Sequence, residues 1–233
     1  MKLRARDEIS AEEEAAIRSS LLPRAAVPAD TTIIRPGEEL RHSTLLLDGI
    51  ACRYKDMRDG QRQITELHVA GDFLDLHSFT LKRLDHFVMA LTPCKLALMP
   101  HTKLTEITER HPHLTRVYWF GTNVDAAVHR EWEVSLGRRS ALSRLAHLFC
   151  ELNVRLEIVG LSDGMYYDLP LTQAEVADCL GITPVHCNRV MQELRERKLL
   201  EWKGGRLSIL NRDELARVGE FDPAYLYLEK RRR

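Results

Sequence analysis

Two sets of capping signals, close together in the C-terminal part of the sequence, constrain the fold more than any other feature. Thr172 and Glu175 have the spacing of a capping box, in which a hydroxyl and a carboxylate bind the free N–H groups that open a helix. Gly181 can adopt the left-handed conformation that ends such a helix, because it has no Cβ. Thr183 then offers a second N-cap, and Pro184 suits the first helical position. The pattern predicts two helices joined by a short turn.

The second of these helices is predicted to have one apolar and one polar face. Cys187, Val190, Met191 and Leu194 recur at helical spacing and predict a buried stripe. On the opposite face an arginine can donate two hydrogen bonds to guanine, an asparagine or glutamine can pair with adenine, and a valine can contact a thymine methyl group. This combination indicates a helix that reads DNA in the major groove. An ordinary helical hairpin with a solvated polar face is the alternative.

A short hairpin is predicted directly after the two helices. Residues 199–209 alternate in hydrophobicity around Gly204-Gly205, as the strands of a wing would. Lys203 and Arg206 flank the tip, where they could meet phosphates. The residues predicted to contact DNA are Thr172, Thr183, Val185, His186, Asn188, Arg189, Gln192, Lys203 and Arg206.

The charge balance gives no indication of the partner. The 233 residues include 34 Lys and Arg and 34 Asp and Glu, so any positive surface that binds DNA must be local. The first residues lack the apolar core of a signal peptide, and no run approaches the roughly 20 apolar residues of a membrane helix. These features predict a cytoplasmic protein without a membrane partner.

The cysteines are five in number, widely spaced and without a CxxC pair, which argues against a disulfide framework, a zinc ribbon or a local iron–sulfur motif. They are Cys52, Cys94, Cys150, Cys179 and Cys187. Cys187 is expected to be a small buried residue of the second helix. A redox-sensitive thiol beside the DNA-binding face is the alternative at this position.

The N-terminal half is predicted to contain a leading helix followed by many short strands. Ser10 and Glu13 form a capping-box pattern. Short apolar runs separated by glycine-containing turns then predict an antiparallel jelly roll. The fold class is therefore α+β. The predicted strands are Thr31–Ile34, Leu45–Leu47, Ile50–Tyr54, Ile64–Val69, Phe87–Leu91 and Leu96–Met99.

Residues 111–136 return to helical spacing and predict one long helix. We predict that its apolar stripe forms a homodimer interface, although the stripe could instead pack on the jelly roll. A twofold dimer would place two reading helices in successive major grooves, about 34 Å apart, on a nearly palindromic site. The predicted domains are 1–110, 111–136 and 137–233. The stripe comprises Leu114, Val117, Gly121, Val124, Val128 and Trp132.

This order of elements resembles the Crp/Fnr family of bacterial transcription regulators. The resemblance rests on Arg35-Pro36-Gly37-Glu38, on the Gly71-Asp72 turn and on residues 171–200. It implies a jelly roll like a cyclic-nucleotide-binding domain, a dimerisation helix and a C-terminal winged helix-turn-helix. It also implies a homodimer that binds double-stranded DNA, contacts RNA polymerase and responds to an effector in the jelly roll.

The sequence departs from the family pattern at the expected effector pocket. Gly71 and Asp72 match the family turn, but Leu84 and Asp85 stand where cyclic-AMP receptors have an Arg-Ser pair. An aspartate facing a phosphate is repulsive, which argues against cyclic AMP bound by the usual contacts. No cysteine precedes Cys52, so the N-terminal cluster that holds an iron–sulfur group in the oxygen-sensing branch is missing. The sequence does not name the effector.

Two other classes of function fit the sequence less well. A cupin-type metal enzyme could share the jelly roll, with His42, His68, His77 and His86 as ligands, but these histidines are scattered along the chain. A haem ligand at His77 rests on that one residue alone. A protein-binding scaffold would favour aromatic residues on the outer face of the second helix, where this chain has polar ones. We therefore predict a regulator rather than an enzyme.

Overall fold

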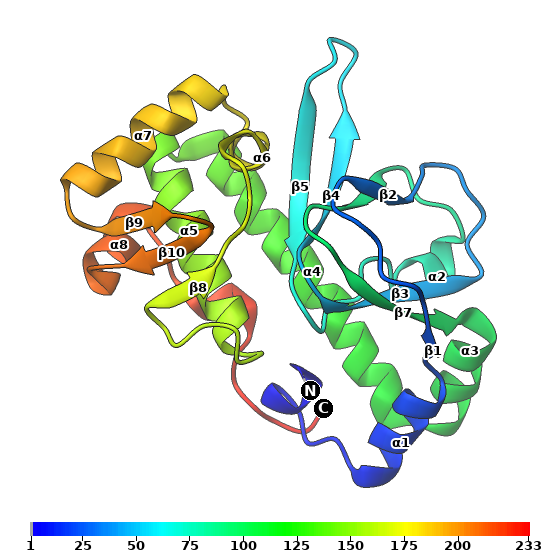
Figure 1. The fold of residues 1–233 in the computed structure, drawn as a ribbon. Helices are drawn as coiled ribbons and strands as arrows, with labels where there is room; N and C mark the ends of the chain where they lie inside the picture. The colour runs from blue at the N-terminus through cyan, green and yellow to red at the C-terminus, as the bar shows by residue number, and fades with distance from the viewer. Residues whose placement is uncertain (1) are drawn as a thin grey trace. The chain divides into compact units, whose positions relative to one another are not determined.

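The computed structural model describes residues 2–233, which form two compact units (Figure 1). The first unit comprises residues 2–55, Glu66–Ala127 and Tyr227–Arg233, and the second comprises Asp56–Thr65 and Val128–Leu226. The division falls inside one long helix, between Ala127 and Val128, whereas the sequence predicted that this helix would form a separate segment. The tip of one hairpin also belongs to the second unit.

The first unit is an antiparallel β-roll with helices at its N- and C-terminal ends. One sheet has the strand order β1-β7-β3, and the other has the order β2-β6-β4-β5. Apolar side chains from both sheets, including Leu46, Val88 and Leu96, are buried in one core. The elements are η1 (Lys2–Ala5), α1 (Ala11–Ser19), β1 (Leu22–Pro23), β2 (Thr31–Ile34), β3 (His42–Asp48), β4 (Ala51–Asp56), β5 (Arg62–His68), α2 (Ser78–Leu81), β6 (Phe87–Ala90), β7 (Lys95–Pro100) and α3 (His101–Arg110).

The long helix α4 (Pro112–Arg138) contributes residues to both units, and the second unit continues with helices around a small sheet. That sheet has the strand order β8-β10-β9. The remaining elements are α5 (Ala141–Glu157), β8 (Tyr166–Asp168), α6 (Gln173–Leu180), α7 (Pro184–Glu196), β9 (Leu200–Lys203), β10 (Arg206–Ile209), α8 (Arg212–Gly219) and η2 (Pro223–Leu226).

The α+β fold predicted from the sequence is confirmed, including the jelly roll, the long helix and the winged helix-turn-helix. Each of the six predicted apolar runs overlaps a strand, and Ser10 and Glu13 form the predicted capping box of α1. The short strands β1 and β8 and the helices α2, α3 and α8 were not predicted. Across the described part of the chain, no helix combines the length and the apolar character needed to cross a membrane.

The segment Tyr227–Arg233 follows the second unit in sequence but packs within the first. The guanidinium of Arg233 lies 3.4 Å from the centre of the Phe120 ring, a cation–π contact, and Arg233 Nη1 donates to the carbonyl oxygen of Arg6 at 2.6 Å. The ring of Tyr227 meets that of Phe120 edge to face. The chain thus returns to its first unit after completing the second.

Two glycine substitutions should change stability in opposite directions. Gly181 has φ +61°, so Gly181→Ala should lower the free energy of unfolding by about 1–2 kcal/mol. Gly121 lies inside α4, and a methyl group added there would have no atom within 4 Å. Gly121→Ala should therefore raise the free energy of unfolding by about 0.5–1 kcal/mol. Chemical denaturation of both variants tests this pair, and a stabilising Gly181→Ala would contradict the assigned role of the turn.

Candidate nucleic-acid interface

The first helix of the motif, α6, begins and ends as its sequence predicts. The Thr172 hydroxyl accepts a hydrogen bond from Glu175 N at 3.2 Å, and a Glu175 carboxylate oxygen accepts one from Thr172 N at 2.6 Å. Gly181 ends the helix in the left-handed conformation, with its N–H bonded to the Ala177 carbonyl. Thr172 is exposed to solvent, but its hydroxyl is already engaged with Glu175.

The second helix, α7, starts at its predicted cap. The Thr183 hydroxyl accepts a hydrogen bond from His186 N at 3.2 Å, and Pro184 occupies the first helical position. Cys187 and Met191 are fully buried, and Val190 and Leu194 complete the same inward stripe. The inward face predicted for this helix is confirmed.

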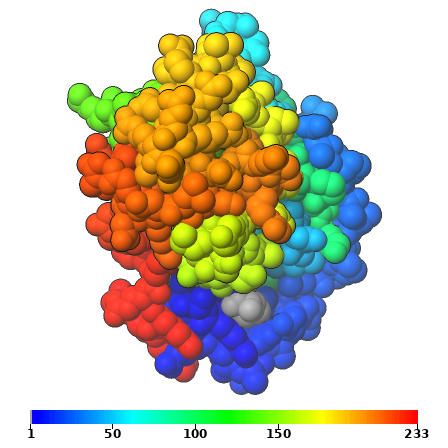
Figure 2. All heavy atoms as spheres, turned by 60° about the vertical axis from the view of Figure 1, so that its left-hand side comes forward, coloured from blue at the N-terminus to red at the C-terminus, as the bar shows by residue number. Residues whose placement is uncertain are grey.

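The opposite face of α7 is open to solvent. Val185 is 76% exposed, and Asn188, Arg189 and Gln192 are also exposed, while His186 is half-buried. In the space-filling view the atoms of α7 and of the adjoining wing lie at the surface (Figure 2). The structure therefore brings the predicted base-reading side chains together on one accessible helical face.

The wing is a two-stranded hairpin formed by β9 and β10. Its tip residues Gly204 and Gly205 both have positive φ, as a tight turn requires. Lys203 and Arg206 are exposed on either side of the tip, and Arg206 Nε lies 3.2 Å from Asp168. That carboxylate partly offsets the charge of Arg206, so Lys203 is the stronger candidate for a phosphate contact.

Two residues far from the motif in sequence hold the end of α6. Arg62 on β5 forms an ion pair with Asp178, in which two guanidinium nitrogens each lie 2.8 Å from the same carboxylate oxygen. Arg144 Nη1 on α5 donates to the Leu180 carbonyl at 2.6 Å. Neither residue was predicted, because nothing in the local pattern links them to positions so distant along the chain.

The residues predicted to line an effector pocket have different surroundings in the structure. Asp72 accepts a hydrogen bond from Val69 N at 2.9 Å and forms an ion pair with Lys2, which also packs against Gly71. Leu84 belongs to the hydrophobic core. Asp85 is mostly exposed and bonds Lys55 at 2.6 Å and His86 at 2.9 Å. Because each side chain has separate surroundings, these contacts do not support a shared pocket, which stays a prediction.

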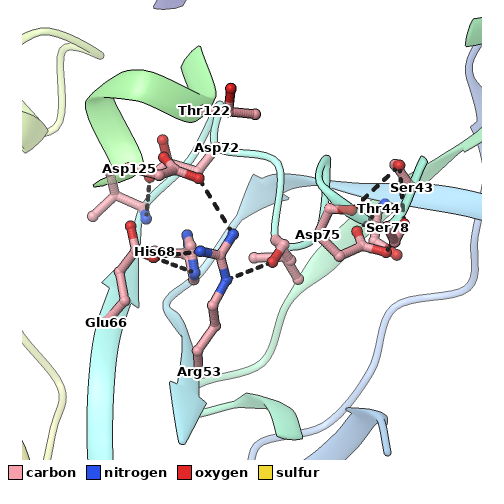
Figure 3. Close-up of polar contacts among 12 residues, drawn as sticks. Ser43, Thr44, Arg53, Glu66, His68, Asp72, Asp75, Ser78, Thr122 and Asp125 are labelled. Carbon is pink, nitrogen blue, oxygen red and sulfur yellow. Dashed lines mark hydrogen bonds and ion pairs between the residues drawn. The ribbon is translucent and has the colours of Figure 1, made fainter. Parts of the chain in front are cut away.

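A buried ion-pair network lies in the first unit instead (Figure 3). The guanidinium of Arg53 donates to the Leu74 carbonyl at 2.8 Å, to Glu66 at 2.6 Å and to Asp125 of α4 at 3.3 Å. Burial disfavours the charged form, but the two carboxylates outweigh it and raise the pKa of Arg53. Arg53 therefore joins the β-roll to the long helix through internal partners.

A second buried polar group surrounds Asp75. Its carboxylate accepts hydrogen bonds from Thr44 N at 2.5 Å and from the Ser78 hydroxyl at 3.1 Å. Burial nevertheless raises the pKa of Asp75 to about 6. Ser78 also lies 3.2 Å from Nε2 of His101, whose pKa burial lowers to about 4.

Most side chains of the apolar stripe of α4 are buried within the single chain, so the structure gives no support to a dimer interface at this stripe. Leu114 and Val117 belong to a core that includes Ile17 and Met99, and the Trp132 indole donates to Glu151 at 3.1 Å. Val124 and Val128 are also buried, and a methyl group added at Gly121 would meet no atom within 4 Å. The alternative, packing on the jelly roll, fits Leu114 and Val117, which share a core with Met99 of β7. Trp132 instead contacts α5, and the space beside Gly121 is open.

Neither the redox hypothesis nor the metal hypothesis gains support from geometry. Cys187 is completely buried, and burial raises the pKa of its thiol to about 11, which disfavours the reactive thiolate. Among residues 2–233, no three His, Cys, Asp or Glu side chains gather as metal ligands would. Of the four candidate histidines, His77 and His86 have adjacent rings, with centroids 5.5 Å apart.

Comparison with known proteins identifies the two parts of this architecture. Residues 24–111 match the cyclic nucleotide-binding domain, and residues 143–218 match the Crp-like helix-turn-helix domain. The chain belongs to the Crp/Fnr family. It is therefore a transcription regulator of the Crp/Fnr type with a helix-turn-helix DNA-binding domain.

Individual relatives are similar over most of this chain. A probable transcriptional activator of Rhizobium leguminosarum bv. viciae is 29% identical over 84% of this chain and 80% of its own. The transcriptional activator protein FnrL of Cereibacter sphaeroides is 28% identical over 76% of this chain and 72% of its own. The structure of FixK2 from Bradyrhizobium japonicum aligns with a TM-score of 0.75 at 22% identity, covering 84% of this chain and 97% of that one.

The buried Asp75 carboxyl should give the protein an unusual pH dependence. Its raised pKa means that the folded state binds the proton more tightly than the unfolded chain. The stabilising contribution is thus complete below pH 3.8 and is lost as the pH rises through about 6. Carboxyl NMR should show Asp75 titrating near pH 6, and Asp75→Asn should remove this decline in unfolding free energy.

Asp163→Asn provides a control of opposite sign. The backbone N–H groups of Met165 and Tyr166 lower the pKa of Asp163, so its contribution is present above its unfolded pKa and is lost as the pH falls. A titration of Asp75 near its ordinary value of 3.8 would refute the assignment.

Proposed function

We propose that this regulator binds DNA as a homodimer at a nearly palindromic site, with α7 in the major groove of each half-site. The observation that carries the proposal is the division of α7 into two faces. Its inward stripe is buried, while Val185, Asn188, Arg189 and Gln192 are exposed. A helix anchored in this way presents hydrogen-bonding side chains to base edges without disturbing its own core.

The chemistry of these side chains predicts the kind of half-site. Arg189 can bind the O6 and N7 of guanine, and Asn188 or Gln192 can pair with N6 and N7 of adenine. Val185 offers a methyl contact to thymine and lacks the carboxylate that would accept from cytosine N4. The half-site should therefore differ from that of relatives with a glutamate at this position.

The exposed face of α4 is the dimer interface in this proposal. Trp119 is 68% exposed, and Val134 is exposed as well. Positions 119, 123, 126, 130, 133 and 137 are all exposed and alternate in steps of three and four, which is the spacing of a two-stranded coiled coil. Arg130 and Glu133 carry opposite charges that could pair across a twofold axis. This face replaces the buried stripe that the sequence suggested.

The first unit is proposed to control this DNA binding, with an effector that is still to be identified. Asp72 is engaged by Lys2, and Asp85 by Lys55 and His86. Both positions thus carry a carboxylate with its own partners, and a carboxylate does not bind the phosphate of cyclic AMP in the usual way. RNA polymerase is the proposed protein partner, and the cytoplasm of a bacterium, which holds the DNA, is the proposed location.

Selection of duplexes from a random pool by the purified protein, followed by sequencing, tests the proposal directly. We expect enrichment of a sequence with twofold symmetry whose half-sites are one helical turn apart. Binding should weaken steeply as salt rises, because phosphate contacts release counterions. Enrichment of no sequence at low salt would refute the function.

Arg189→Ala should relax the preference for guanine at one position in each half-site. The expected loss is about 1–3 kcal/mol of specific binding per half-site, with little change on random DNA. Fluorescence anisotropy with the selected duplex and with single-base variants measures both effects. Arg217→Ala, which alters an exposed ion pair with Glu214 on α8, is the matched control and should leave binding unchanged. An equal loss on specific and random DNA would contradict base reading by Arg189.

Trp119→Glu should weaken the dimer at least tenfold, because it replaces a large exposed apolar side chain of the proposed interface with a charge. Analytical ultracentrifugation measures the dissociation constant. Leu81→Glu, at an equally exposed apolar residue of α2, is the control and should leave the dimer intact. If Trp119→Glu dimerises like the wild type, the interface lies elsewhere.

A further inference from the structure

The tip of the β4–β5 hairpin belongs to the same compact unit as the helix-turn-helix. Residues Asp56–Thr65 cluster with Val128–Leu226, although the hairpin is an extension of the β-roll in sequence and in strand pairing. Its side chains meet the C-terminal end of α6. Arg62 pairs with Asp178 through two nitrogens, as described above.

Gln63, the next residue, binds the backbone of α6. Its side-chain amide donates to the Asp178 carbonyl at 2.8 Å and lies 3.5 Å from the Cys179 carbonyl. The last carbonyl groups of a helix have no partner within the helix, so donors from outside determine how firmly that end is held. Gln63 and Arg144 together provide donors for three successive carbonyl groups, those of Asp178, Cys179 and Leu180.

The held end of α6 is also the start of the turn to the recognition helix. Gly181 follows Leu180 directly, and a methyl group added to Gly181 would lie 3.2 Å from the side-chain oxygen of Gln63. Thr183, the N-cap of α7, is two residues further on. A displacement of this end of α6 would therefore be passed to the first turn of α7, where Val185 and His186 lie.

The strand that carries Arg62 and Gln63 enters the buried network of the first unit three residues later. Glu66 on β5 binds Arg53 at 2.6 Å, and Arg53 also binds Asp125. A β-strand is already close to the full length of the chain, so Gln63 and Glu66 cannot move further apart along its axis. One strand thus connects the ion-pair network to the end of α6 through the covalent chain.

We propose that Arg62 and Gln63 are positioning residues of the DNA-binding site. They hold the C-terminal end of α6 and thereby set the angle at which α7 meets DNA. This inference rests on the proposed DNA binding, which it extends by assigning part of the affinity to a strand of the β-roll.

The test combines a measurement of α6 itself with a measurement of DNA affinity, both on the full chain. Gln63→Glu keeps the shape of the side chain but removes the amide donor, and Arg62→Asp reverses the charge that faces Asp178. Hydrogen exchange of the Gly181 and Ile182 amides, which bond to the Ala177 carbonyl, reports how firmly the end of α6 is held. Anisotropy with the duplex selected by the wild type reports affinity.

We expect each substitution to raise exchange at these two amides and to weaken binding roughly fivefold. The double variant Arg62→Asp/Asp178→Arg restores the ion pair with its charges exchanged. It should bring both the exchange rates and the DNA affinity most of the way back to the wild-type values. A general loss of stability would not be reversed in this way. Lys103→Glu, in an exposed ion pair with Glu106 on α3, should change neither readout.

Unchanged exchange at Gly181 and Ile182 would overturn the proposal, as would faster exchange without any loss of affinity for the selected duplex. Failure of the wild type to select a duplex would refute the proposed function instead. The exchange data would still decide whether Arg62 and Gln63 hold α6.

Discussion

The proposed reading of DNA by α7 depends on the burial of the opposite face of this helix. A helix of 13 residues is only marginally stable by itself in water, so its apolar stripe must pack against the rest of the unit. Cys187 and Met191 are completely enclosed there, which fixes the rotation of the helix about its own axis. Because that rotation is fixed, the outward-facing side chains are always Val185, Asn188, Arg189 and Gln192.

Charged and polar groups inside the first unit are paired with one another through buried hydrogen bonds and ion pairs. Arg53 has three protein partners, one of them on α4, and Asp75 is enclosed among hydroxyl and backbone donors. Buried ion pairs contribute little net stability, but removing one partner leaves an unpaired charge at high cost. The geometry of the β-roll against the long helix is therefore specified by electrostatics as well as by apolar packing.

Local signals predicted the fold and the buried face of α7 correctly. They did not predict which distant segments pack against a given surface. Capping boxes, the glycine turn and the alternation of short strands depend on neighbouring residues, and the structure contains them. The stripe from Leu114 to Trp132 showed only that one face of α4 is covered, and the covering side chains come from distant segments. Likewise Arg53 and Gln63 have roles set by partners far along the chain, which no local pattern reveals.

The return of Tyr227–Arg233 to the first unit has a consequence for dissecting the molecule. The longer segment of the DNA-binding unit, Val128–Leu226, lies between two segments of the first unit in sequence, as an inserted domain does. A fragment that begins in the middle of α4 would contain Tyr227 and Arg233 but would lack Phe120, the ring that both of them contact. Fragments prepared for biophysical work would be better ended after Leu226 than at the end of this sequence.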